Sequence, residues 1–168
     1  KLKESLKHLA ELTGSKSFND IRSYLEALPP NEKGKVFEHY LAYLFEGNGY
    51  LVKVSGGKGD LGADILLYNP KTPQQVDLIV QAKNWSSPLP FDDVKSELIK
   101  FEDRGRKKYN CTFYQLISTN GFVKDAHKLS EFNISLYDWK FVDKLISNYD
   151  DSNKSNALID LRPHNQLS

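Results

Sequence analysis

The sequence is poor in the features that mark secreted, membrane-spanning and zinc-binding chains. Among its 168 residues it has one cysteine, Cys111, and no methionine. A single cysteine excludes an internal disulfide and a cysteine zinc cluster, so a reducing, cytoplasmic setting is expected. No apolar run approaches the ~20 residues that cross a bilayer, and the charged first residues lack the apolar segment of a secretory signal. We therefore expect no contact with a membrane.

A surplus of positive charge is also missing. The 23 Lys and Arg residues balance 22 Asp and Glu residues, which gives a formal net charge of +1. Domains that bind nucleic acid strongly by themselves usually carry a clear basic excess. What the sequence does have is a 39% share of hydrophobic residues with nine Tyr and nine Phe, enough for the core of one domain.

Apolar spacing, prolines and glycines divide the chain into helices and strands. Asn31 is expected to cap a helix that ends before Gly47, and Asp92 is expected to cap a later one. The expected helices cover 2–12, 18–28, 32–46, 92–109, 123–131 and 139–149. The expected strands cover 50–55, 63–68, 76–83, 111–118 and 134–137.

The order of these elements predicts a mixed sheet. Residues 63–83 form two strands around a proline-containing turn, which indicates an antiparallel hairpin. Strands and helices alternate after residue 90, and this alternation favours parallel pairing. We therefore expect an α/β fold with a mixed central sheet flanked by helices, and with extra N-terminal helices over 1–30. The core would cover 31–149, followed by a polar linker over 150–168.

The hairpin brings polar side chains together at one of its ends. A register centred near residue 72 pairs residue i with residue 145 − i, which places Asp64 opposite Gln81. Directly opposed residues have Cβ atoms about 4.5–5.5 Å apart. Because side chains alternate along a strand, Lys83 lies on the same side as Gln81. Asp64, Gln81 and Lys83 are therefore expected to form one cluster.

A carboxylate in an apolar helix stripe is a further candidate. Glu38 precedes Leu41, Ala42 and Phe45 by three, four and seven residues, so its side chain lies beside their apolar face. Burial of an unpaired charge is costly, and such a carboxylate needs a partner. Either a metal ion or Lys83 would provide one.

Each of these residues alone has a simpler structural explanation. An Asp beside glycines usually forms a turn, a Gln-x-Lys in a strand is usually solvated, and a Glu beside an apolar stripe usually lies at the surface. Their occurrence together, in an order that brings them to one point, favours a shared site. Residues 57–62 also spell G-x-G-x-x-G, but a dinucleotide site needs a helix after the third glycine, and a strand is expected there.

At these residues the chain resembles the Mrr-like branch of the PD-(D/E)xK nucleases. The similar segments are KGKVFEHYLAYLFEGNGY with Glu38, GGKGDLGADI with Asp64, VQAKNW with Gln81 and Lys83, and LISTNGF. The resemblance covers residues 34–146. It implies the restriction-endonuclease-like fold and the hydrolysis of phosphodiester bonds in double-stranded DNA.

The resemblance also implies roles for individual residues. Asp64, the side-chain oxygen of Gln81 and the backbone carbonyl of Ala82 would bind one or two Mg²⁺ ions, which prefer oxygen ligands. Glu38 would join this ligand set and add the negative charge that the Gln81 amide lacks. Lys83 would position or activate the attacking water.

Loops beside this end of the sheet supply secondary candidates. Asp60 is expected either to bind the metal or to cap the amides of the glycine-rich loop, and both alternatives stay open. Lys58, Asn84, Trp85 and Thr119 flank the expected catalytic end of the strands, and they are candidates for contact with DNA.

The end of the chain carries a second resemblance. Residues 161–166, LRPHNQ, are similar to the entry segment of superfamily 2 helicase-like ATPases. Together with the nuclease motifs, they resemble the start of single-chain Type ISP restriction-modification enzymes. That family implies partner domains in the same chain, namely an ATPase, a methyltransferase and a target-recognition domain, and transient pairing of two nuclease domains. Because phosphate contacts supply most sequence-independent DNA affinity, a nearly neutral nuclease would cut weakly alone and depend on the motor.

Two other functions stay open. One is a stand-alone methyl-directed restriction nuclease, which differs in having no ATPase after Ser168. The other is a degenerate nuclease-like module that only binds DNA or a partner. Gln81 stands where the commoner nuclease motif has an acid, and this difference favours the second alternative. The presence of Asp64, Lys83 and Glu38 opposes it.

Overall fold

The computed structural model describes residues 1–55 and 62–152. The helices are α1 (Leu2–Gly14), α2 (Phe18–Ala27), α3 (Pro30–Glu46), α4 (Phe91–Lys100), the π-helical turn η1 (Phe101–Gly105), α5 (Arg106–Tyr109), the 3-10 helix η2 (Lys124–Leu129) and α6 (Trp139–Ser147). The strands are β1 (Leu51–Val54), β2 (Ile65–Tyr68), β3 (Val76–Lys83), β4 (Tyr114–Ser118) and β5 (Ile134–Tyr137).

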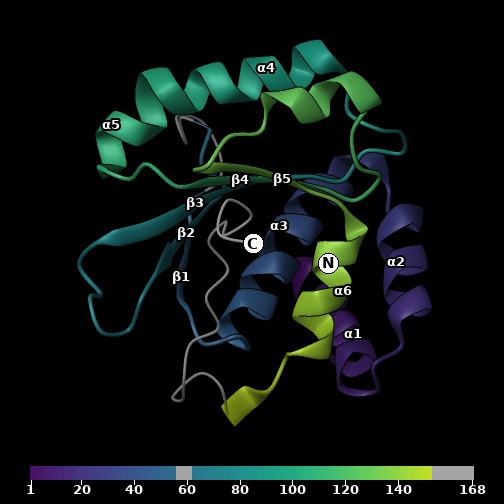
Figure 1. Cartoon of the computed structure of the whole chain (residues 1–168). Helices are drawn as coiled ribbons and strands as arrows, with labels where there is room; N and C mark the ends of the chain where they lie inside the picture. The colour runs from purple at the N-terminus through teal and green to yellow at the C-terminus, as the bar shows by residue number, and fades with distance from the viewer. Residues whose placement is uncertain (56–61, 153–168) are drawn as a thin grey trace.

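The strands form one mixed sheet in the order β1-β2-β3-β4-β5. β1, β2 and β3 pair antiparallel, whereas β3, β4 and β5 pair parallel. Helices α1, α2, α3 and α6 lie on one face of the sheet, and α4 and α5 lie across the other (Figure 1). This arrangement confirms the predicted fold class. Within the described ranges, no helix has both the length and the apolar character needed to cross a membrane.

The central strand β3 is buried on both faces, which explains its continuous apolar run. Leu78 and Val80 belong to the core beneath α3 and α6, whereas Ile79 belongs to the core beneath α4. The two sets alternate because successive side chains of a strand point to opposite faces. Packing on both faces therefore fixes the position of β3, including the residues at its end.

The predicted hairpin register is confirmed. Ile65 pairs with Val80, Leu66 with Ile79 and Leu67 with Leu78. The register shifts only at the far end of the hairpin, between Leu67 and Tyr68. The ladder continues past β2, since the backbone N–H of Asp64 donates to the carbonyl of Val80 at 2.9 Å.

Two predicted helix caps are wrong. Helix α3 begins at Pro30 with Pro29 as its N-cap, so Asn31 lies inside the first turn. Proline suits this place because its fixed φ is helical and its missing N–H would have no intrahelical acceptor. Helix α4 likewise begins at Phe91 after the N-cap Pro90. Asp92 lies in its first turn, where a negative charge interacts favourably with the positive end of the helix dipole.

Two other helices differ from their predictions in geometry. The helix expected over 92–109 has the expected extent, but a π-helical turn at Phe101–Gly105 interrupts it. The helix expected over 123–131 is a 3-10 helix at Lys124–Leu129. Short 3-10 helices serve as connectors, and here the connector joins two neighbouring parallel strands.

Candidate active site

A cleft of about 600 Å³ opens between the start of α3 and the end of β3. The four residues predicted to carry the chemistry, Glu38, Asp64, Gln81 and Lys83, all line it, together with Ala82. The other lining residues are Pro30, Lys33, Gly34, Asn84, Trp85, Ser86 and Ser87. The structure therefore brings predicted residues from α3, from β3 and from the position before β2 to a common space.

The carboxylate of Asp64 is held by the hairpin itself. Asp64 is buried directly before β2, and its Oδ2 accepts a hydrogen bond from the Gln81 side-chain Nε2 at 2.9 Å. The same oxygen accepts from the backbone N–H of Ala82 at 3.0 Å. Both donors belong to β3, so the register of the β2–β3 pair fixes the carboxylate. Asp64 and Gln81 lie on the same side of the sheet, as predicted.

The amide of Gln81 leaves an oxygen for another partner. Its Nε2 is committed to Asp64, whereas its Oε1 is buried and has no hydrogen-bond partner among the described residues. Buried polar atoms normally have a partner, and a cation bound in the cleft would supply one to this oxygen. An amide oxygen beside a carboxylate suits a hard divalent cation.

Any cation bound here would depend on mixed ligands. Within residues 1–55 and 62–152, no three His, Cys, Asp or Glu side chains lie together as a metal site. Among the described residues that line the cleft, the carboxylates are Asp64 and Glu38, so the amide of Gln81 and backbone oxygens would complete the set. Glu38 is half-buried in α3, and the residues one before and three after it, Phe37 and Leu41, belong to the core.

Lys83 has an ion-pair partner that the sequence analysis missed. Its Nζ lies 3.0 Å from Oε2 of Glu97, a buried residue of α4. Glu97 lies three residues after Val94 and four before Phe101, which are both fully buried. It is thus a carboxylate in an apolar helix stripe. This is the same signal that selected Glu38, and it could have found Glu97.

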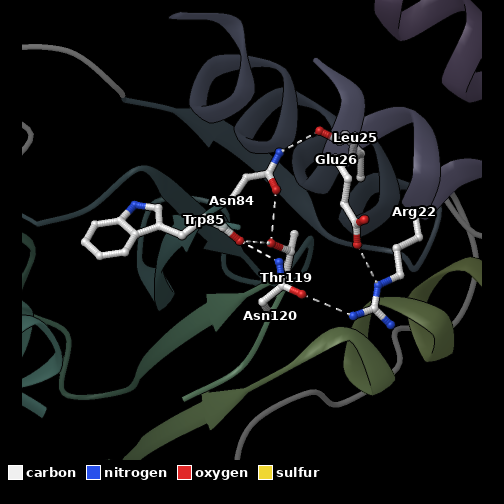
Figure 2. Close-up of polar contacts among 7 residues, drawn as sticks. All are labelled: Arg22, Leu25, Glu26, Asn84, Trp85, Thr119 and Asn120. Carbon is white, nitrogen blue, oxygen red and sulfur yellow. Dashed lines mark hydrogen bonds and ion pairs between the residues drawn. The ribbon is translucent and has the colours of Figure 1, made fainter. Parts of the chain in front are cut away.

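Asn84 and Thr119 belong to a hydrogen-bond network that joins the ends of β3 and β4 to α2 (Figure 2). Asn84 Nδ2 donates to the carbonyl of Leu25 at 3.1 Å, and its Oδ1 accepts from Thr119 Oγ1 at 3.0 Å. Asn120 Nδ2 donates to the Trp85 carbonyl. Asn84 and Thr119 are both buried, and these hydrogen bonds join their side chains to other parts of the protein.

Trp85 differs from its neighbours because its side chain reaches the surface. It is 39% exposed at the cleft, and its ring centre lies 6.0 Å from Lys83 Nζ. Figure 2 shows the indole pointing away from the network that binds the Trp85 carbonyl. Among the predicted DNA contacts in the described ranges, Trp85 has the most accessible side chain. Lys58 and Asp60, the remaining loop candidates, lie outside the described residues.

The fold and the cleft define a protein of restriction-endonuclease architecture. Residues 31–146, more than half of the chain, match the restriction endonuclease family Mrr_cat. The chain belongs to this family. Neither the curated proteins nor the solved structures gave a match.

Proposed function

We propose that this chain is a Mg²⁺-dependent DNA endonuclease domain that hydrolyses phosphodiester bonds without reading sequence. The observation that carries the proposal is the pairing of Gln81 with Asp64 inside the cleft, which leaves the Gln81 Oε1 without a hydrogen-bond partner among the residues that the structure describes. Membership of the restriction endonuclease family supports DNA as the substrate.

The residues of the cleft would have two roles: four of them would bind the cation, and Lys83 would supply a positive charge. Asp64, Gln81 through Oε1, the backbone carbonyl of Ala82, and Glu38 would hold the cation. When bound, Mg²⁺ supplies positive charge at the scissile phosphate and a more acidic water. Lys83 presents its ammonium to the same cleft, where it donates hydrogen bonds to the attacking water or to a phosphate oxygen. A fixed donor directed at developing negative charge lowers the barrier to reaction.

Efficient cleavage would depend on delivery of DNA by an attached motor. The net charge of +1 gives little sequence-independent attraction to phosphates. We propose an arrangement like that of Type ISP enzymes, with an ATP-driven translocase, a methyltransferase and a target-recognition domain in the same protein. In this arrangement the isolated domain nicks DNA weakly and without sequence preference, and two such domains meet to break both strands.

A plasmid-nicking assay with Mg²⁺ tests the proposal. Asp64→Ala and Lys83→Ala should each reduce nicking by about 10²–10³-fold, as is typical when one stabilising group is removed from an active site. Asp20→Ala and Lys144→Ala change exposed residues that do not line the cleft, and they should retain wild-type nicking.

Other outcomes would select another function. Nicking that survives both cleft substitutions would move the active site elsewhere. DNA binding without nicking by the wild-type chain would favour a binding module, for which the amide at Gln81 is the structural argument. Efficient, site-specific cutting by these 168 residues alone would contradict dependence on a motor.

A further inference from the structure

Glu97 is a buried carboxylate next to the cleft but separate from the residues that line it. It is 7% exposed, and its neighbours along the α4 stripe are apolar. A carboxylate in such surroundings is costly unless it is paired. Its Oε2 lies 3.0 Å from Lys83 Nζ, which is the distance of a strong charge-assisted hydrogen bond. We infer that Glu97 is a positioning residue, which holds the Lys83 ammonium in its catalytic place. This inference rests on the proposed nuclease function.

Lys83 needs such a partner because its side chain is long and flexible. It is the last residue of β3, and four methylene groups separate its ammonium from the rigid strand. Catalysis by an ammonium group requires a fixed position, since a displacement of about 1 Å can reduce a rate by about 100-fold. Glu97 restrains the Nζ atom from the side of α4. The Trp85 ring, 6.0 Å from Nζ, lies beside it at the cleft.

A second contact connects α4 to the segment that carries Asp64. Gly62 has a φ of +79°, and a Cβ atom at this position would lie 3.2 Å from the Cβ of Lys100 in α4. The chain therefore passes very close to α4 two residues before Asp64. The same helix thus touches the approach to the proposed metal ligand and pairs with the catalytic lysine. Glu97 therefore fixes the position of the Lys83 ammonium relative to the Asp64 carboxylate.

Lys100 provides an internal comparison. Its Nζ lies 3.6 Å from the same Glu97 oxygen, but its side chain is 52% exposed, against 21% for Lys83. Lys100 does not line the cleft. Loss of Lys100 should therefore leave the Lys83–Glu97 pair in place, and Lys100→Gln is a matched control for the loss of one charge beside Glu97.

Single-turnover cleavage of a plasmid with Mg²⁺ tests the positioning role. Glu97→Gln keeps the shape of the side chain and removes its charge, and it should lower the cleavage rate by about 100-fold. The DNA concentration giving half-maximal rate should change by no more than about twofold, because Glu97 does not touch the substrate. Glu97→Asp should recover part of the rate, and Lys100→Gln should cut like the wild type.

A second measurement does not depend on activity. An amine-acylating reagent is applied to the metal-free protein, and modification of Lys83 is followed by peptide mass spectrometry. An ammonium held by a carboxylate reacts slowly, so Lys83 should be modified faster in Glu97→Gln than in the wild type or in Lys100→Gln. This readout holds even if the wild type fails to cut DNA, an outcome that would refute the proposed function alone.

Three results would overturn the inference. They are an unchanged cleavage rate in Glu97→Gln, an unchanged rate of Lys83 acylation, and an equal loss of activity in Lys100→Gln. If Glu97→Gln does not fold, Glu97→Asp takes its place, because it keeps the charge and shortens the side chain by one methylene. Wild-type activity in Glu97→Asp, together with wild-type acylation of Lys83, would then refute the positioning role.

Discussion

Gln81 donates a hydrogen bond of 2.9 Å to Asp64 across the β2–β3 hairpin, and so an amide stands next to a carboxylate in the cleft. An amide can donate to its neighbour and still present an oxygen. A second carboxylate at this position could not donate when ionised, and it would repel the first. The hairpin can therefore keep two oxygen-bearing side chains together before any cation binds.

Gln81→Glu should make the stability of the protein depend on pH and on metal. With two carboxylates in contact, the pKa of one of them is raised, because like charges disfavour ionisation. A raised carboxyl pKa stabilises the fold at low pH, and this contribution is lost as pH rises above the ordinary value of about 4.3. In EDTA, the melting temperature of Gln81→Glu should therefore fall relative to wild type between about pH 4 and pH 8.

The exposed turn residue Gln75 offers the control for this prediction. Gln75→Glu adds the same charge outside the cleft, and it should show no such trend. Mg²⁺ should raise the melting temperature of Gln81→Glu more than that of the wild type, because binding to the native state stabilises it. A difference between Gln81→Glu and wild type that does not vary with pH would contradict the contact between the two side chains.

Calcium should bind the cleft without supporting efficient cleavage. Its coordination is looser than that of Mg²⁺ and positions a water less strictly. Thermal melting with Ca²⁺ should show a shift that Asp64→Ala abolishes, whereas plasmid nicking should stay near background. Robust cleavage in Ca²⁺ would argue against the ligand set of Asp64, Gln81, Ala82 and Glu38.

Asn84 and Trp85 are neighbours with opposite expected effects. Asn84→Ala removes the hydrogen bonds to Leu25 and Thr119 and should lower the free energy of unfolding by about 1–3 kcal/mol. Trp85→Ala truncates an exposed side chain and should change stability by less than about 0.5 kcal/mol.

DNA binding should show the reverse order. Trp85→Ala should weaken binding to duplex DNA several-fold, because a contact between the exposed indole at the cleft and the DNA surface would be lost. Denaturant unfolding and fluorescence anisotropy with a labelled duplex measure the two quantities. Equal DNA affinity of Trp85→Ala and wild type would remove Trp85 from the substrate contacts.

Burial should suppress the ionisation of the Cys111 thiol at alkaline pH. Loss of hydration raises the pKa of its thiol to about 11. The native protein should therefore react slowly with a thiol reagent at pH 8, and unfolding in denaturant should remove this protection.

The same shift has a consequence for stability. A raised pKa favours the neutral thiol in the folded state, so its contribution is complete below the ordinary thiol value of about 8.5 and is lost as pH rises from there. The free energy of unfolding of Cys111→Ala should fall less steeply than that of wild type above about pH 8.5. Parallel curves would contradict the burial of the thiol.

Local sequence signals were enough to predict most of the fold and the contact between Asp64 and Gln81. A turn with two prolines fixes the centre of the hairpin, and the period of two along a strand then fixes which residues face each other. Asp64 and Gln81 could be paired for this reason. Parallel pairing of β3, β4 and β5 followed from the alternation of strands with helices.

The features that were missed depend on packing between distant segments. The Lys83–Glu97 pair forms only when α4 docks on the sheet, and no periodicity shows which strand residue a helix will meet. The π-helical turn at Phe101–Gly105 begins next to Lys100, where α4 approaches Gly62, and this approach is also a tertiary contact. The helix starts at Pro30 and Phe91 were misplaced because a polar residue nearby offered a stronger cap signal.

The first 30 residues pack against the rest of the domain, and this packing limits how far the N-terminus can be truncated. The family match starts at residue 31, yet Ile21 and Leu25 share one core with α3, and Thr13 and Tyr40 are hydrogen-bonded at 2.7 Å. A protein trimmed to the family boundary would expose apolar side chains of α3 to water and would lose the Leu25 carbonyl that accepts a hydrogen bond from Asn84. Such a truncation should give insoluble material, so expression trials should keep both leading helices.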